Sequence, residues 1–181
     1  MTYYLTTCPS PVGRLTLASD GQGLAGLWLE GQKYFCQPLL PGECVQDGSP
    51  AVFEAARQWL ARYFAGEKPH PCELPLRPVG GAFRQQVWAL LCGIPYGGTT
   101  TYGALAKQVA AQMGRPSMSS QAVGGAVGHN PISIIIPCHH VVGAGGSLTG
   151  YAGGLAAKVK LLAHEGVDVR RLHAPKTGTA L

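Results

Sequence analysis

The most informative stretch of this chain is Ile134-Ile135-Ile136-Pro137-Cys138-His139-His140-Val141-Val142. Its β-branched apolar run predicts a buried strand. A cysteine at the end of such a strand, behind a proline and beside an imidazole, is placed like a nucleophile with its base at hand. A lone cysteine is more often a small core hydrophobe, but the other five cysteines lack this setting. Cys138 is therefore the candidate reactive residue.

Further motifs flank this stretch on both sides. Before it comes Val123-Gly124-Gly125-Ala126-Val127-Gly128-His129-Asn130-Pro131, and after it Gly150-Tyr151-Ala152-Gly153-Gly154-Leu155 and Leu161-Leu162-Ala163-His164-Glu165-Gly166. With these motifs in this order and spacing, the chain resembles the O6-alkylguanine-DNA alkyltransferases, the single-turnover DNA repair proteins, from about Gly81 to Gly166. The segment Ser10-Pro11-Val12-Gly13-Arg14-Leu15 matches more loosely.

The resemblance implies an α+β fold in two parts. A small β-rich N-terminal domain, ribonuclease-H-like in the family, precedes a mainly helical domain of the winged helix-turn-helix type. We place the first domain at residues 1–68 and the DNA-binding and alkyl-acceptor domain at 81–170. Residues 69–80 hold four prolines and are predicted to be a linker. The tail, 171–181, has no hydrophobic period and is predicted to be frayed or disordered.

Local patterns predict the elements of the first part. Residues 3–7 are a strand candidate, and residues 14–19 and 24–29 flank Asp20-Gly21, a hairpin turn signal. Residues 36–48 have the composition of a loop. A helix is expected up to Gly66, with Ser49 as its cap and Pro50 in its first turn.

The second part is predicted to be mostly helical, with helices over 83–91, 102–113, 119–127 and 155–164. The second and third, joined by residues 114–118, have the length and turn chemistry of a helix-turn-helix. The third helix has small side chains and no basic residue, which allows close backbone approach with little base reading. The family places this helix in the minor groove of duplex DNA. The expected DNA contacts are Ser119, Ser120, Gln121, Ala122, Gly125 and Ala126.

The distribution of charge favours a polyanionic partner. The 181 residues carry a formal charge of +5. Residues 1–73 hold five Lys/Arg and seven Asp/Glu, whereas residues 74–181 hold nine and two. No carboxylate occurs between Glu73 and Glu165, a stretch that carries Arg77, Arg84, Lys107, Arg115, Lys158 and Lys160. Such a stretch fits nucleic acid, although a solvated basic surface without a ligand has the same composition.

Composition also limits location and cofactors. The sequence shows no signal peptide and no apolar run of transmembrane length, so we expect a cytoplasmic monomer that associates with the nucleoid. No cofactor is expected. The six cysteines contain no CxxC pair, which does not favour zinc. A zinc site in the N-terminal part would have to draw on Cys8, Cys36, Cys44, Cys72 and His70.

The resemblance assigns roles in the chemistry. An alkyl group on guanine oxygen needs a strong nucleophile, and a free thiol is mostly protonated at neutral pH, so it needs a base. Cys138, His139 and Glu165 match the family's nucleophile, base and orienting carboxylate, with a water bridging the first two. Tyr102 matches the tyrosine that donates a proton toward the guanine ring, and Asn130 the hinge residue. The expected pocket residues are Tyr151, Ala152, Gly153, Lys158 and Val141.

Two positions depart from the family pattern. The target oxygen lies inside the duplex, so the nucleotide must be flipped out, and the family usually holds the gap with an arginine. Here that position is Gln121. His140 stands where the family usually has arginine after the Cys-His pair. The expected reaction is irreversible transfer of the alkyl group from O6-alkylguanine to Cys138, with O4-alkylthymine left open as a second substrate.

Three other functions remain open at this stage. The first is a cysteine hydrolase or transferase built on Cys138, His139 and Glu165, which would need an oxyanion hole. The second is a sensor that binds alkylated DNA without repairing it, although that branch of the family lacks the cysteine. The third is a helix-turn-helix transcription factor, which would require a basic recognition helix.

Overall fold

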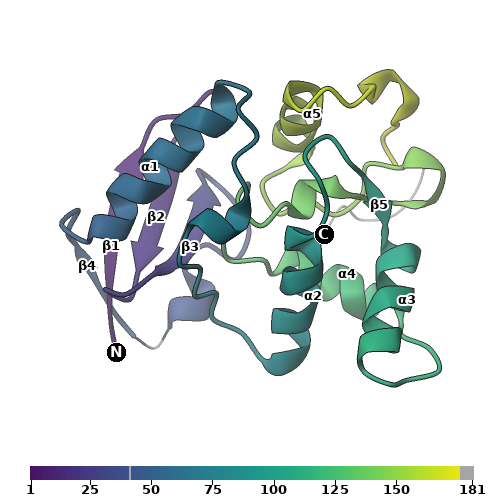
Figure 1. Cartoon of the computed structure of the whole chain (residues 1–181), viewed down its shortest axis with the longest axis horizontal. Helices are drawn as coiled ribbons and strands as arrows, with labels where there is room; N and C mark the ends of the chain where they lie inside the picture. The colour runs from purple at the N-terminus through teal and green to yellow at the C-terminus, as the bar shows by residue number, and fades with distance from the viewer. Residues whose placement is uncertain (41, 176–181) are drawn as a thin grey trace.

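The computed structural model describes residues 1–40 and 42–175. Its N-terminal half is a sheet of four strands, β1 (Thr2–Cys8), β2 (Leu15–Ser19), β3 (Leu24–Leu29) and β4 (Glu43–Gln46), in the order β3-β2-β1-β4 (Figure 1). β2 pairs antiparallel with both β1 and β3, and β4 runs parallel to β1. The three strands predicted from the sequence and their hairpin turn are confirmed. Gly21 adopts a φ of 89° in that turn, which glycine tolerates without strain.

The prediction of a loop over 36–48 was wrong. These residues include a 3₁₀ turn at Gln37–Leu39, whose Leu39 is buried, and the edge strand β4. All four residues of β4 are exposed. An edge strand joined only through its backbone to β1 shows no apolar alternation, so its sequence resembles that of a loop.

Helix α1 (Ala51–Phe64) covers one face of the sheet (Figure 1). The predicted helix is confirmed, and its buried side chains recur at helical spacing: Val52, Phe53, Ala56, Trp59, Leu60 and Tyr63. The expected cap was wrong, because Pro50 occupies the capping position and no side chain caps the helix. Ser49 is instead engaged by Asp47, which accepts from both its backbone N–H and its hydroxyl.

The C-terminal half contains the four predicted helices, α2 (Ala82–Cys92), α3 (Tyr102–Gln112), α4 (Ser120–Gly128) and α5 (Leu155–His164). Helices α2, α3 and α4 pack against one another. Two short strands, β5 (Thr100–Thr101) and β6 (Val141–Val142), form a parallel pair. The bounds of α5 agree with those predicted, and it is followed by Gly166 with a φ of 82°, as expected of a helix stop.

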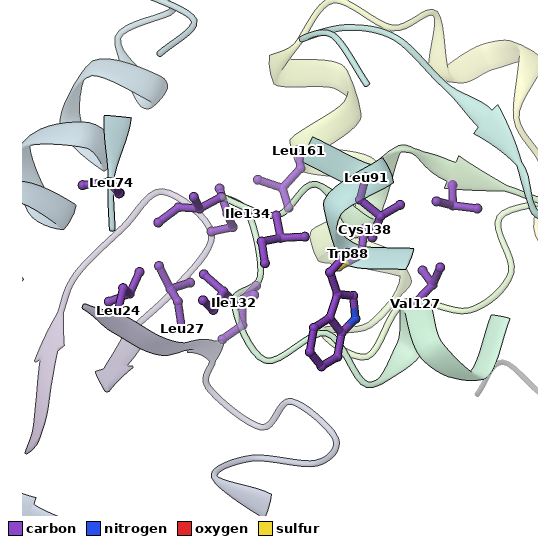
Figure 2. Close-up of a cluster of buried hydrophobic side chains, with 14 of the residues drawn as sticks. Leu24, Leu27, Leu74, Trp88, Leu91, Val127, Ile132, Ile134, Cys138 and Leu161 are labelled. Atoms are coloured by element: carbon purple, nitrogen blue, oxygen red, sulfur yellow. The ribbon is translucent and has the colours of Figure 1, made fainter. Parts of the chain in front are cut away.

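The outer edge of β3 joins the two halves. Leu24 exchanges backbone hydrogen bonds of 2.8 Å with Pro75 and Arg77, within the segment predicted to be a linker. Leu27 does the same with Pro131 and Ser133, at 2.8 Å each. A single core therefore runs across the boundary, as Figure 2 shows. It includes Leu24, Leu27, Leu74, Trp88, Leu91, Val127, Ile132, Ile134, Cys138 and Leu161.

The predicted strand at 134–136 was also wrong. Ile134 has a φ of 70°, and the chain folds back in successive tight turns with Ile135 N–H bonded to Ser133 O and Ile136 N–H to Ile132 O. Only Ile132 makes a bridge, to Leu27. The run is buried on all sides, and a fully apolar run indicates burial without fixing the backbone conformation.

The start of the tail is more ordered than expected. A 3₁₀ turn spans Val169–Arg171, and His173 exchanges backbone hydrogen bonds with Gly146 and Leu148. The prediction of disorder for 176–181 lies outside the described residues. Over residues 1–40 and 42–175, no helix combines the length and apolarity needed to cross a membrane.

Candidate active site

Cys138 opens a 3₁₀ turn, Cys138–His140, and its side chain is buried at 4 % exposure. The amide Nδ2 of Asn130 donates to its Sγ at 3.1 Å. Burial raises the pKa of the Cys138 thiol, and the hydrogen bond from Asn130 and the positive charge of Lys158 oppose that rise. The site therefore holds a protonated thiol that needs a base before it can react.

Asn130 organises the turns that lead to the cysteine. Its Nδ2 also donates to the carbonyls of Ile132 at 3.3 Å and Ile136 at 2.8 Å, and its Oδ1 accepts from Ile132 N–H at 3.0 Å. These bonds supply the partners that a neighbouring strand would otherwise give. One buried side chain thus fixes both the backbone before Cys138 and the position of its sulfur.

Glu165 follows α5 and is buried, with four donors on its carboxylate. Oε1 accepts from His139 Nε2 and from the Tyr63 hydroxyl, each at 2.7 Å. Oε2 accepts from His140 Nε2 at 2.6 Å and from Gly97 N–H at 2.7 Å. Burial by itself raises the pKa of Glu165, but the hydrogen bonds from His139 and His140 outweigh it and hold that pKa well below its usual range. The group is an anion at neutral pH.

His139 has the state required of a base. Burial lowers its pKa to about 4, against the hydrogen bond to Glu165 that raises it, so its imidazole is neutral at pH 7. Because an ionised carboxylate only accepts, Nε2 carries the proton and Nδ1 keeps its lone pair. No described atom is a hydrogen-bond partner of that buried Nδ1. Its lone pair is therefore free to accept a proton or a hydrogen bond.

Sequence reasoning missed two of the four groups that hold Glu165. Tyr63 lies in the other half of the fold, in a segment for which the sequence predicted a helix but no functional role. Gly97 has a φ of 74°, and a Cβ there would lie 2.8 Å from the Glu165 carbonyl oxygen. His140 was noted only as a departure from the family pattern, and its ring packs against His139 with centroids 4.4 Å apart.

Tyr102 begins α3 beside an open cavity of about 510 Å³. Its hydroxyl donates to the carbonyls of Thr149 at 3.0 Å and Gly150 at 3.2 Å. Burial, and then the neighbouring Cys138, raise the pKa of Tyr102 well above its usual range, so it remains a proton donor. The cavity joins the start of α4 to the 149–150 loop and is lined by Tyr102, Ser120, Gln121, Gly124, Gly125, Thr149 and Gly150.

The five residues expected to line the pocket are not among those lining residues. Lys158 is fully buried, and its Nζ donates to the carbonyls of Val141 at 2.6 Å and Thr149 at 2.8 Å. Burial lowers its pKa to about 8. A Cβ on Gly153 would lie 2.7 Å from the ring of Tyr151, so glycine is needed there for close packing. Lys158 thus holds the carbonyl of Thr149, a residue that lines the cavity, and is not available to a polyanion.

Most of the expected DNA contacts lie at the exposed start of α4. Ser119 caps the helix by accepting from Ala122 N–H at 3.3 Å, and Ser120, Gln121 and Ala122 are exposed. Ala126 differs from the prediction. Its side chain is buried at 3 % exposure and its carbonyl accepts from Trp88 Nε1 at 2.9 Å, because it faces α2 rather than solvent. Gly125 is half-buried and lines the cavity.

Potential metal ligands gather at one place within residues 1–40 and 42–175, where ligand atoms of His139, His140 and Glu165 lie within 4.8 Å of one another. Those atoms are joined by hydrogen bonds, which is the arrangement of a proton relay. Of the residues considered for zinc, His70 and Cys72 contact each other at 2.8 Å, and Cys8, Cys36 and Cys44 are free thiols.

Comparisons with known proteins show the family of this chain. Residues 3–78 match the family model "6-O-methylguanine DNA methyltransferase, ribonuclease-like domain", and residues 82–167 match that family's DNA binding domain. The chain is 45% identical to a methylated-DNA–protein-cysteine methyltransferase of Haemophilus influenzae over 159 residues, which is 88% of this chain and 84% of that protein. A protein of the same name from Mycolicibacterium paratuberculosis is 44% identical over 174 residues, 96% of this chain and 95% of its own.

A solved structure shows the same architecture. The crystal structure of Mycobacterium tuberculosis OGT in complex with DNA superposes with a TM-score of 0.74 at 40% identity, covering 97% of this chain and 96% of that one. An N-terminal domain containing a sheet, followed by a helical C-terminal domain, is thus common to both. On the matches over nearly its whole length, the chain belongs to the 6-O-methylguanine DNA methyltransferase family.

Proposed function

We propose that this protein repairs duplex DNA by moving the alkyl group of O6-alkylguanine irreversibly onto Cys138. One observation carries the proposal. The neutral His139 directs a free Nδ1 lone pair away from Glu165, in a site where Asn130 holds the Cys138 sulfur. A nucleophile, a base and an orienting anion are therefore present together. Membership of the family supports the same function.

The proposed reaction moves one alkyl group from guanine to Cys138 and one proton from Cys138 to guanine. The Cys138 proton passes to His139 Nδ1, through a bridging water if the family arrangement holds, and Glu165 stabilises the imidazolium. The thiolate attacks the alkyl carbon, the carbon–oxygen bond breaks, and its electron pair stays on the guanine. Tyr102 donates a proton to the guanine as that bond breaks and regains a proton from the Cys138–His139–Glu165 relay. The products are unmodified guanine and S-alkylcysteine, a thioether with no route back.

The proposed DNA interface is the start of α4. We infer that α3 and α4 act as a helix-turn-helix in a winged arrangement, with α4 in the minor groove and the flipped base in the 510 Å³ cavity. Exposed Lys107 on α3 and Arg115 on the α3–α4 connection are placed to contact phosphates. The proposal also includes a ribonuclease-H-like N-terminal domain and a monomer that acts on nucleoid DNA in the cytoplasm.

The test is an intact-mass and peptide-mass measurement after incubation with an equal amount of duplex carrying one O6-methylguanine. The expected result is one added methyl group on the Cys138 peptide, with stoichiometric repair of the duplex. Tight binding without a mass change would instead indicate a damage sensor. If the protein neither bound the duplex nor gained mass, a cysteine hydrolase would be the better explanation.

Gln121 provides a test of the DNA face. A Gln121→Arg variant is expected to bind duplex DNA more tightly and to steepen the dependence of log K on log salt by about one unit, because one added cation displaces about one counterion. Fluorescence anisotropy over a salt series measures both. Gln58→Arg, at an exposed position of α1, adds the same charge away from this face. It should change neither the affinity nor its dependence on salt. Equal effects from both variants would show that α4 does not contact DNA.

A further inference from the structure

The sheet-containing half contributes one side chain to the active site. Tyr63, in the last turn of α1, donates its hydroxyl to Glu165 Oε1 at 2.7 Å. The same oxygen accepts from His139 Nε2 at 2.7 Å. Tyr63 is 2 % exposed, so the contact is closed to water. Since His139 and Tyr63 share one carboxylate oxygen, anything that moves the phenol also changes the partner of the base.

The four donors on Glu165 divide evenly between its oxygens. His140 and Gly97 fix Oε2, and both lie in the helical half. On Oε1, His139 is the group that changes charge during reaction, which leaves Tyr63 as the constant donor. Without the phenol hydroxyl, the orientation of Oε1 would depend on the reacting imidazole alone.

Tyr63 itself is held rigidly. Its ring stacks on Trp59 with centroids 5.5 Å apart and meets the edges of Phe64 at 5.0 Å and Tyr96 at 5.8 Å. Its carbonyl accepts from His164 Nε2 at 2.8 Å. Aromatic packing on α1 and a hydrogen bond from α5 therefore set the hydroxyl before any substrate binds, as a preorganised site requires.

We propose that Tyr63 is a positioning residue for alkyl transfer, which holds the Glu165 carboxylate in line with His139 and limits its proton affinity. The inference rests on the proposed function and gives the N-terminal half a part in it. A donor on a carboxylate stabilises the anion. Removal of that donor makes Glu165 a more basic partner, and a more basic partner favours the protonated form of His139.

The expected pH dependence follows from this stabilisation of protonated His139. His139 must be neutral to accept the thiol proton, so transfer is lost as the pH falls through its pKa. If loss of the phenol raises that pKa, the acid limb of the rate profile moves to higher pH. The titratable groups that face Glu165 are His139 and His140 from the 138–140 turn, Tyr63 from α1 and Tyr96 from the α2–β5 loop. His139 is also faced by Tyr151 and by Lys158 from α5, whose charge lowers the pKa of His139. Burial keeps the Tyr63 hydroxyl protonated, because it raises the pKa of that group far above its usual range.

The experiment compares Tyr63→Phe with Tyr96→Phe. Each variant removes one phenol hydroxyl from the same aromatic cluster, but the Tyr96 hydroxyl donates to the His164 carbonyl rather than to Glu165. Single-turnover methyl transfer from an O6-methylguanine duplex is measured from about pH 4 to 9 at saturating DNA, together with the half-saturating DNA concentration and the urea midpoint of unfolding. The lower end of this range reaches the acid limb, because the pKa of His139 is about 4.

For Tyr63→Phe, we expect the plateau rate to fall about three- to tenfold and the acid limb to move up by roughly half a pH unit. The half-saturating concentration should stay unchanged. Tyr96→Phe should retain the wild-type profile. A Tyr63→Phe profile that superposes on the wild type overturns the proposal, and so does an equal change in both variants, which would indicate a packing effect alone.

A second measurement separates this inference from the proposed function. Iodoacetamide modification of the Cys138 peptide, followed by mass spectrometry against pH, reports on the relay without DNA. Failure of the unchanged protein to accept methyl from the duplex would refute the repair function only. A Tyr63→Phe modification profile displaced to higher pH would still support the positioning role, and an undisplaced one would refute it.

Discussion

A Cys138→Ser variant is expected to bind duplex DNA as the unchanged protein does and to accept no methyl group. A hydroxyl has a far higher proton affinity than a thiol, and the base beside it has a pKa of only about 4, so the alkoxide does not form. We expect single-turnover transfer to fall by at least about 10³-fold, with DNA affinity within about twofold because phosphate contacts do not involve this buried group. Transfer is followed by peptide mass and binding by anisotropy.

Cys92→Ser is the matched control for this change. Cys92 ends α2, is half-buried and is not among the described groups that hydrogen-bond to Glu165. The Cys92→Ser variant should repair the duplex at the wild-type rate and carry the transferred methyl group on Cys138. Retained transfer by Cys138→Ser, or a methyl group found on another cysteine, would refute the assignment of the nucleophile.

An Asn130→Ala variant is expected to show the largest loss of stability of any single change proposed. The substitution removes donors to the Ile132 and Ile136 carbonyls and to the Cys138 sulfur, as well as the acceptor for Ile132 N–H. Buried polar groups would be left without partners in a turn that already holds Ile134 at a φ of 70°. We expect the free energy of unfolding to fall by about 3–5 kcal/mol, measured by urea denaturation.

Ser133→Ala serves as the smaller comparison within the same turns. Its hydroxyl donates to Gln32 Oε1 at 3.0 Å, and losing it should cost only about 1 kcal/mol. Residual folded Asn130→Ala protein should also transfer methyl more slowly, because the sulfur loses its fixed donor. Equal destabilisation by the two variants would mean that Asn130 does not organise the turns.

Local patterns were sufficient where short-range physics decides the structure. A helix was predicted over residues 155–164 and α5 has these bounds, and Asp20-Gly21 marked the hairpin. Local patterns failed where a side chain or strand outside the segment decides its backbone conformation. The Ile134–Ile136 run folds as turns because the Asn130 amide and the edge of β3 hold it, and neither interaction is visible in a periodic pattern.

The candidate site divides in the same way. Cys138, His139 and Glu165 were predicted from motifs, and the structure brings His139 and Glu165 into hydrogen-bond contact beside Cys138. Tyr63 lies 102 residues from Glu165 in sequence, and no local pattern indicates that its hydroxyl reaches a carboxylate. Of the expected pocket residues, Val141, Tyr151 and Lys158 are buried and do not line the cavity beside Tyr102, because side-chain direction depends on packing that sequence spacing does not reveal.

The burial of Glu165 has an electrostatic consequence for a protein that must approach a polyanion. Its side chain is 1 % exposed and surrounded by four donors. The other carboxylate between residues 74 and 175 is Asp168, which is paired with Arg170 and Arg171. The helical half thus keeps a full negative charge buried against His139 while presenting almost none to the phosphates. Burial therefore keeps the negative charge of Glu165, which the relay needs, away from the DNA phosphates, which would repel it.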